Sequence, residues 1–291
     1  MAEGTRRLRL AMQRQGRLTE GTTSLLRGIG LRFEDYRQRL LTPCRNFPLD
    51  ILYGRDDDIP EYVADGTVDL GIVGRNIIVE KGARVEELLT LGFGYCSLVV
   101  AVPNDSPVIA AEQLSGQRVA TSYPRSARQY FERLGAEVEL VELSGSVEVA
   151  PALGIASAIV DLTATGSTLV LNDLKEIATV LESEAVLIAN PKSFAAPGIH
   201  LEIDRLLVRI NSRLAAGRHK YITMNAPETA LSKIKEIVPG LKTPTVVPLA
   251  EDGWVAVHTV IAENDFWELI ERLRDAGASG IVVMPVENLL T

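Results

Sequence analysis

The chain has 291 residues, of which 46% are hydrophobic and 23% are charged, with 23 Gly and 14 Pro. This composition excludes the disordered, collagen-like and coiled-coil classes, and the length favours two or three domains over a single core. The 30 Lys and Arg residues against 38 Asp and Glu give a formal net charge of -8, which disfavours a protein that coats nucleic acid.

Short apolar runs alternate with segments of helix length through the first two thirds of the chain. This alternation predicts βαβ units with largely parallel sheets. The predicted strands are residues 8–12, 50–53, 68–73, 96–102, 117–121, 138–143 and 158–162, and the predicted helices are 19–28, 59–64, 126–134 and 147–153. Asp58 fits the N-cap of the helix that begins at Ile59, so capping offers a structural explanation for the acidic run at 56–58.

An apolar run at 98–103 ends in the polar turn 104–107, as expected of a strand that leaves one α/β lobe and enters another. Residues 185–189 are predicted to form the returning strand. We therefore expect a two-lobed body, with residues 1–97 and 183–213 in the first lobe and 98–182 in the second. A cleft between two such lobes is a preferred place for a ligand.

The last part of the chain has a different pattern. Strands are predicted at 220–225, 244–249, 254–261 and 280–286, with helices at 227–238 and 265–276. This β-α-β-β-α-β order is ferredoxin-like, and the strands lack the stacking aromatic residues of an RNA-binding version. We expect a small-molecule or subunit-interaction domain at 214–291, with a connecting helix at 206–216.

The cysteine content and the lengths of the apolar runs indicate the cellular compartment of the protein. Cys44 and Cys96 are too few for a disulfide framework or a CxxC metal site. The basic N-terminus lacks the apolar core of a signal peptide, and no apolar run reaches the ~18 residues of a membrane span. We therefore expect a cytoplasmic protein that binds neither membranes nor nucleic acid.

The segment DLTATGSTL, residues 161–169, carries the clearest chemical signal. An apolar strand ends in Asp161, five small or hydroxyl residues surround Gly166, and a helix is predicted to begin at Thr168. Backbone N–H groups and hydroxyls at a helix start can hold a phosphate, and an acid after a strand can bind ribose hydroxyls. The alternative is a tight turn whose hydroxyls only cap the helix.

This segment resembles the phosphoribosyl pyrophosphate loop of the ATP phosphoribosyltransferase family. It also shares a Thr-Gly-x-Thr element with purine phosphoribosyltransferases, but Leu162 replaces the second acid of that family's pair. Six further segments match the first family in order, and the resemblance covers nearly the whole chain: MQRQGRL (12–18), RDDDIP (55–60), DLGIVG (69–74), ATSYP (120–124), GSVEVAP (145–151) and KYITMNAP (220–227).

The resemblance implies a fold and an activity. The fold would be a periplasmic-binding-protein-like catalytic body followed by an ACT-like regulatory domain. The activity would be transfer of a phosphoribosyl group to N1 of ATP with Mg2+ as cofactor, in the first step of L-histidine biosynthesis. The family also implies feedback inhibition by histidine and dimers that assemble into hexamers. Such chemistry needs positioning and charge stabilisation more than a covalent nucleophile.

The resemblance also assigns roles to residues. Catalytic roles go to Asp161, Glu148 and Arg17, with Asp161 and Glu148 on the ribose hydroxyls and Arg17 on nucleotide phosphates. ATP binding is assigned to Arg17, Asp69 and Tyr123. The phosphoribosyl pyrophosphate site would comprise Asp161, Thr163, Ala164, Thr165, Gly166, Ser167 and Thr168. From the residues alone, Glu148 could instead complement a helix dipole, and Tyr123 could simply pack beside Pro124.

For the effector, the resemblance points to Asn225, Leu241, Thr245 and Gly280. Asn225 stands where some relatives carry an acid. The resemblance assigns Mg2+ no protein ligand, because substrate oxygens and water supply most of its ligands. A different class of function stays open: a two-lobed body with a ferredoxin-like domain could sense a metabolite without catalysing a reaction.

Overall fold

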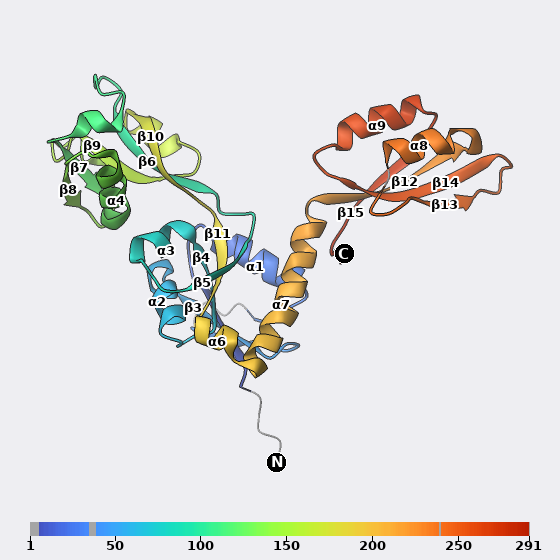
Figure 1. The fold of residues 1–291 in the computed structure, drawn as a ribbon, viewed down its shortest axis with the longest axis horizontal. Coiled ribbons are helices and arrows are strands. Elements are labelled where there is room, and N and C mark those ends of the chain that lie inside the picture. The colour runs from blue at the N-terminus through green and yellow to red at the C-terminus, as the bar shows by residue number, and fades with distance from the viewer. Residues whose placement is uncertain (1–5, 35–38, 239, 291) are drawn as a thin grey trace, which may run out of the picture. The chain divides into compact units, whose positions relative to one another are not determined.

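The computed structural model describes residues 6–34, 39–238 and 240–290. The chain forms two compact units (Figure 1). The first contains the residues up to Ser24 and from Leu31 to Ile203, and the second contains Leu25–Gly30 and the residues from Asp204 onward. The first unit itself holds two sheets, which we call the first and second lobes together with the helices that pack on them.

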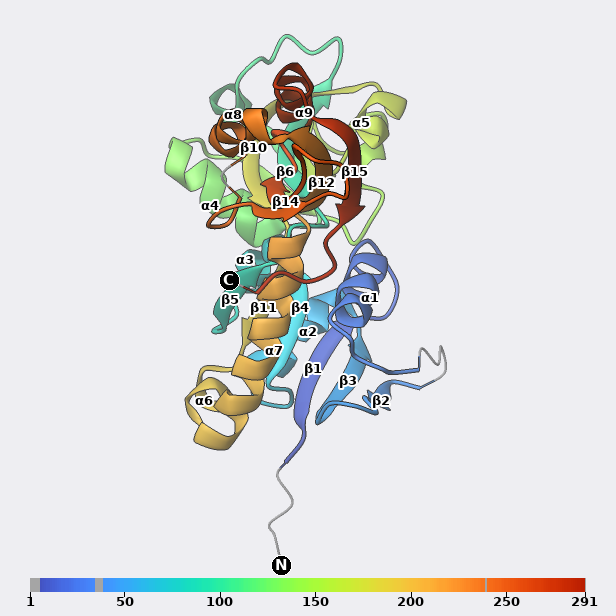
Figure 2. The same ribbon diagram turned by 90° about the vertical axis from the view of Figure 1, so that its right-hand side faces the viewer.

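The sheet of the first lobe places β1 (Leu8–Gln13) at its centre. Its order is β2 (Leu41–Pro43), β3 (Leu49–Gly54), β1, β4 (Leu70–Gly74), β11 (Ala185–Ala189) and β5 (Glu86–Thr90). β1 is parallel to β3 and β4, as Figure 2 shows, whereas β11 is antiparallel to both of its neighbours. The helices of this lobe are α2 (Ile59–Ala64), α3 (Arg75–Lys81), α6 (Pro191–Ala195) and the first part of α1 (Thr19–Gly28), whose residues from Leu25 onward belong to the second unit.

The second lobe has a five-stranded sheet with an apolar core on each face. Its order is β10 (Leu174–Ser183), β6 (Cys96–Pro103), β9 (Ala158–Thr163), β7 (Arg118–Thr121) and β8 (Glu139–Glu142). The helices are α4 (Pro124–Leu134) and α5 (Ser167–Leu171), with short 3-10 turns at Ala111–Leu114 and Val147–Val149. The two strands β6 and β10 pair along their whole length and carry the chain into and out of this lobe.

The second unit contains a four-stranded sheet, two helices that pack on it and most of a longer helix that precedes it. The long helix α7 (Pro197–Ala216) precedes β12 (His219–Pro227), a 3-10 turn at Glu228–Ala230, α8 (Leu231–Ile237), β13 (Thr245–Pro248), β14 (Trp254–Ala262), α9 (Phe266–Asp275) and β15 (Ser279–Pro285). The antiparallel order β13-β14-β12-β15 confirms the ferredoxin-like prediction. Its core joins strand residues such as Ile222 and Val257 to Ile234 of α8 and Leu273 of α9.

Several predicted elements are confirmed, among them the helices at 19–28 and 59–64 and the returning strand at 185–189. The predicted helix at 147–153 is wrong, since only a 3-10 turn forms there. Asp58 occupies the N-cap position of α2, as predicted, with Pro60 in the first turn after it. The 3-10 turn Asp56–Asp58 runs directly into α2, so Asp58 already has helical angles (φ -90, ψ -23), and its side chain makes no capping bond within the described part of the chain. The residue boundaries of the lobes and of the C-terminal domain stay predictions.

Candidate functional site

Arg17 lies where the parallel strands of the first lobe end. It follows Gly16 in the turn after β1, and its guanidinium donates a hydrogen bond to the carbonyl oxygen of Gly94. The same guanidinium lies beside Gly74 at the end of β4. Open α/β sheets bind ligands at the carboxyl ends of their strands, so Arg17 occupies a position suited to an anionic ligand.

A pocket of about 710 Å³ lies between the lobes. The first lobe contributes the charged side chains of Asp57, Glu80 and Lys81. The second lobe contributes residues at and after the ends of β7, β8 and β9: Thr121, Ser122, Tyr123, Pro124, Glu142, Leu143, Ser144 and Asp161. Two residues that the sequence predicts for opposite substrates, Asp161 and Tyr123, therefore line one cavity.

Asp161 is partly buried near the end of β9. Burial raises the pKa of its carboxyl to about 6, and the negative charge of Glu148 also raises it, whereas a hydrogen bond donated by the Leu162 N–H (2.8 Å) lowers it. This coupling shows that Glu148 lies close to Asp161, although Glu148 does not line the pocket. The pair can accept hydrogen bonds from the two adjacent hydroxyls of a ribose.

The loop after Asp161 holds itself in a tight conformation. Thr163 Oγ1 accepts a hydrogen bond from the Gly166 N–H (2.9 Å), and the hydroxyls of Thr165 and Ser167 are 2.9 Å apart. Gly166 has φ 75 and occupies the N-cap of α5. The side chains around it are exposed, at Ala164, Thr165, Ser167 and Thr168. The loop thus offers hydroxyls and backbone N–H groups to solvent at the start of a helix, as an anion site requires.

Tyr123 belongs to both lobes. Its ring packs against the core of the second lobe and against the core of the first. Burial raises the pKa of its hydroxyl, and the nearby Asp161 and Asp57 raise it further, so the phenol stays neutral. Tyr123 thus packs on both cores and also lines the pocket, so its role in ATP binding stays a prediction.

Asp56, to which sequence reasoning gave no role in a site, lies near Arg17 and directly before the pocket residue Asp57. Burial raises the pKa of its carboxyl to about 6, although the positive charge of Arg17 lowers it. Its Oδ1 atom is buried without a hydrogen-bond partner among the described residues. An acidic run directly after a strand was the available signal, but it also fits a helix cap. The capping interpretation gave no reason to single out this partly buried carboxylate, which directly precedes the pocket residue Asp57.

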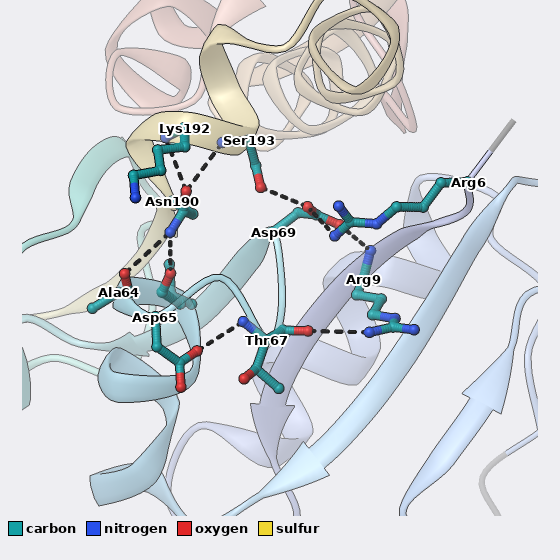
Figure 3. Close-up of polar contacts among 10 residues, drawn as sticks. Arg6, Arg9, Ala64, Asp65, Thr67, Asp69, Asn190, Lys192 and Ser193 are labelled. Atoms are coloured by element: carbon teal, nitrogen blue, oxygen red, sulfur yellow. Dashed lines mark hydrogen bonds and ion pairs between the residues drawn. The ribbon is translucent and has the colours of Figure 1, made fainter.

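Asp69, predicted to bind ATP, is not among the residues that line this pocket, and Figure 3 shows its polar contacts. It precedes β4, about 16 Å along the strand from Gly74. The side chain is fully buried, and its oxygens accept hydrogen bonds from the Arg6 guanidinium (2.7 Å), the Arg9 N–H (2.9 Å) and the Ser193 hydroxyl (2.7 Å). Next to this network, Asn190 caps α6 and donates to the Val63 carbonyl oxygen. These contacts explain Asp69 as a structural carboxylate.

The four predicted effector residues fall into two groups. Asn225 of β12 lies beside Gly280 of β15, where a Cβ on the glycine would lie 3.5 Å from the Asn225 amide. Thr245 lies on β13 at the opposite edge of the sheet, about 14 Å from β15, and Leu241 precedes β13. The structure thus brings Asn225 and Gly280 together and leaves Leu241 and Thr245 apart from them.

Across the described residues, no helix is both long and apolar enough to cross a membrane.

Comparison with known families and proteins bears on this site. The family model described as "ATP phosphoribosyltransferase" matches residues 55–212, and the model described as "HisG, C-terminal domain" matches residues 216–288. The first match includes the pocket residues from Asp57 to Asp161 and the loop after them.

Curated relatives match over nearly the whole chain. The ATP phosphoribosyltransferases of Cytophaga hutchinsonii and Parabacteroides distasonis are each 44% identical over 97% of this chain and cover 98% and 99% of their own lengths. Among solved structures, the ATP phosphoribosyl transferase (HisG:HisZ) complex of Thermotoga maritima aligns with TM-score 0.63 and 26% identity, over 72% of this chain and 98% of that one. The chain therefore belongs to the ATP phosphoribosyltransferase family of pentosyltransferases, in the long form with a C-terminal domain.

Proposed function

We propose that the chain condenses ATP with 5-phosphoribosyl 1-pyrophosphate to give N1-(5-phospho-β-D-ribosyl)-ATP and pyrophosphate, the first step of L-histidine biosynthesis. The observation that carries this proposal is the interlobe pocket that both Asp161 and Tyr123 line, with the hydroxyl-rich loop following Asp161 in the chain. In the reaction, the N1 lone pair of ATP forms a bond to C1 of the ribose. The bond from C1 to the pyrophosphate oxygen breaks, and that oxygen keeps the electron pair.

The loop at 163–168 is proposed to hold the 5-phosphate through backbone N–H groups and the hydroxyls of Thr165, Ser167 and Thr168. Asp161 and Glu148 would accept hydrogen bonds from the ribose hydroxyls. As C1 becomes oxocarbenium-like, these two acids lie on the side of the sugar where their negative charge stabilises it. Holding C1 in place also lowers the entropic cost of bringing N1 to it.

ATP is proposed to lie on the first-lobe side of the pocket. Arg17 would bind nucleotide phosphates, since a guanidinium matches two phosphate oxygens at once. The neutral Tyr123 would contact the adenine base and leave N1 free to react. We leave Asp69 out of these contacts, because its carboxylate is already bound by Arg6, Arg9 and Ser193.

Mg2+ is the proposed cofactor. The part of the chain that the structure describes holds no cluster of three or more His, Cys, Asp or Glu side chains suited to a metal ion. Mg2+ usually takes one or two carboxylates and completes its shell with substrate phosphates and water, so the oxygen donors of Asp57 and Asp161 fit that need. When bound, the ion would neutralise charge on the departing pyrophosphate.

The test is a turnover assay with the purified protein, ATP, phosphoribosyl pyrophosphate, Mg2+ and pyrophosphatase, followed by absorbance of the product. Asp161→Ala should reduce turnover at least 100-fold, in line with the loss of one stabilising group. Asp105→Ala, an exposed acid in a turn of the same lobe, is the matched control. Ligand binding without turnover in the unaltered protein would instead favour the sensing class of function.

Regulation and assembly belong to the same proposal. We propose that L-histidine binds the C-terminal domain and inhibits catalysis, that the chain forms dimers and, when inhibited, hexamers, and that it works in the cytoplasm where its substrates are made. Inhibition requires two states that bind histidine with different affinities. A rise in mass from dimer to hexamer on adding histidine, measured by light scattering, would support this part.

A further inference from the structure

One carboxylate of the first lobe caps a helix of the second. Glu80 lies near the end of α3, and its two oxygens accept hydrogen bonds from the Arg125 N–H (2.9 Å), the Ser126 N–H (2.9 Å) and the Ser126 hydroxyl (2.7 Å). These groups belong to the first turn of α4. The bonds join residues 45 and 46 positions apart in sequence, so they are tertiary contacts.

The helix has no cap of its own in the described structure. Its N-cap residue is Tyr123, whose side chain makes no capping bond, and Pro124 supplies no N–H. The first free N–H groups of a helix need acceptors, and an anion there also meets the positive end of the helix dipole. Glu80 meets both needs from the other lobe, and Ser126 is buried beneath it at 4% exposure.

The capped turn is also a wall of the pocket. Glu80 and Lys81 line the pocket from the first lobe, and Tyr123 and Pro124 line it from the second. Tyr123, directly before the capped turn, packs on the apolar cores of both lobes. The polar cap and the aromatic contact therefore fix the same few residues at the junction where Asp161 faces the first lobe.

We propose that Glu80 is a positioning residue for the reaction: it holds the two lobes at the separation at which the ribose acids of the second lobe and the ATP side of the first can act on one another. This role rests on the proposed function, because it assumes that one substrate is held by each lobe. Glu80 touches neither reacting atom and acts through α4 and Tyr123.

Kinetics separate this role from simple helix capping. Glu80→Ala in the full-length protein should lower kcat at least tenfold and raise the KM for both substrates, since two walls of the pocket are released together. Glu61→Ala, which removes an exposed glutamate from α2, is the matched control and should leave both parameters unchanged. If the unaltered protein shows no turnover, the proposed function fails, whereas normal kcat and KM in active Glu80→Ala would overturn the positioning role alone.

A second variant restores an acidic group at the start of α4 without restoring the contact between the two lobes. In Glu80→Ala combined with Arg125→Glu, the new carboxylate lies at an exposed position in the first turn of α4, where it favours the helix from within its own lobe. Thermal stability should recover while kcat stays low. Recovery of kcat together with stability would show that Glu80 only caps the helix and would contradict the proposal.

A distance measurement needs no substrate. Spin labels on Glu86→Cys in β5 and Arg128→Cys in α4 report the separation of the lobes, because both positions are exposed and the native cysteines are buried. The distance distribution should be narrow with Glu80 present and broader or shifted in Glu80→Ala. An unchanged distance distribution would contradict the proposal that Glu80 holds the two lobes at a fixed separation.

Discussion

At the scale of single residues, the raised pKa of the Asp161 carboxyl predicts how both stability and activity depend on pH. Its folded-state pKa of about 6 lies above the ordinary value of 3.8, because burial and Glu148 disfavour the charge. The folded protein therefore takes up this proton first as the pH falls, and ionisation of Asp161 lowers stability as the pH rises through about 6. Ribose binding needs the ionised form, so kcat/KM should fall as the pH drops below about 6.

Asp161→Asn separates the two effects. The variant should lose activity at every pH and yet raise Tm at about pH 8, where the native carboxyl is charged at a cost. At about pH 4.5 the native group is already protonated in the folded state, so the gain in Tm should shrink. Thermal melts at both pH values measure this difference, and a stability gain that is larger in acid would contradict it.

Asp69 gives the opposite case of a carboxylate stabilised by its partners. Asp69→Ala removes the acceptor for Arg6, Arg9 and Ser193 in a fully buried position, so unfolding free energy should drop by about 3–5 kcal/mol. Asp65→Ala, which loses one exposed bond to the Thr67 N–H, should cost far less. Urea titrations compare the two variants. A higher KM for ATP in Asp69→Ala without loss of stability would restore the ATP-binding role predicted from the sequence.

At the scale of elements, the loop after β9 depends on one glycine. Gly166 has φ 75, and an alanine there would have open space but a strained backbone, costing about 1–2 kcal/mol. Gly166→Ala should therefore raise the KM for phosphoribosyl pyrophosphate about tenfold with little change for ATP. Gly135→Ala is a matched control, because this glycine has φ 68, equally open space and a place at the far end of α4. An equal rise in both variants would show that lobe stability, and not the loop, is responsible.

The elements that the sequence predicted best are those with strong local signals. Helix Ile59–Ala64 has Pro60 in its first turn, and the strand at 185–189 is a continuous buried run. The strand β10 (Leu174–Ser183) was missed, because its segment LKEIATVLES mixes charged and apolar residues without regular alternation, and its pairing with β6 contains two bulges. The conformation of β10 depends on pairing with β6, which lies some seventy positions or more away in the sequence. A local sequence pattern carries no information about such a partner.

The residues of the candidate site show the same difference between local sequence signals and tertiary contacts. The loop at 163–168 and Asp161 are contiguous in sequence, so one motif identified them together. Asp56 and Glu80 acquire their surroundings only in the folded chain: Asp56 lies near Arg17 of the same lobe, and Glu80 accepts bonds from Arg125 and Ser126 of the other lobe. No spacing rule links residues brought together in this way. The ATP-binding role of Asp69, which the family resemblance implies, stays a prediction, and the three partners of its carboxylate lie in other elements of the fold.

At the scale of the whole molecule, an acidic protein with net charge -8 is proposed to bind two polyanions. The pocket itself carries Asp57, Glu80, Glu142 and Asp161 against Lys81. Negative substrates would be repelled from such a cavity unless a cation accompanies them and backbone N–H groups supply the remaining contacts. Binding of phosphoribosyl pyrophosphate should therefore weaken at least tenfold when Mg2+ is removed with EDTA, as isothermal titration would show. Equal affinity with and without Mg2+ would contradict this account of the charge.

The second unit supplies the last prediction, which concerns inhibition by histidine. Asn225 lies beside Gly280 on neighbouring strands, and its amide can accept a hydrogen bond from an ammonium group but offers no charge. Asn225→Asp should therefore tighten histidine inhibition about tenfold, which corresponds to about 1.4 kcal/mol, and Asn225→Ala should weaken it. Glu268→Ala, an exposed acid on α9, should leave inhibition unchanged. Inhibition constants measured at saturating substrates decide the matter, and identical constants in all three variants would place the effector outside the Asn225–Gly280 pair.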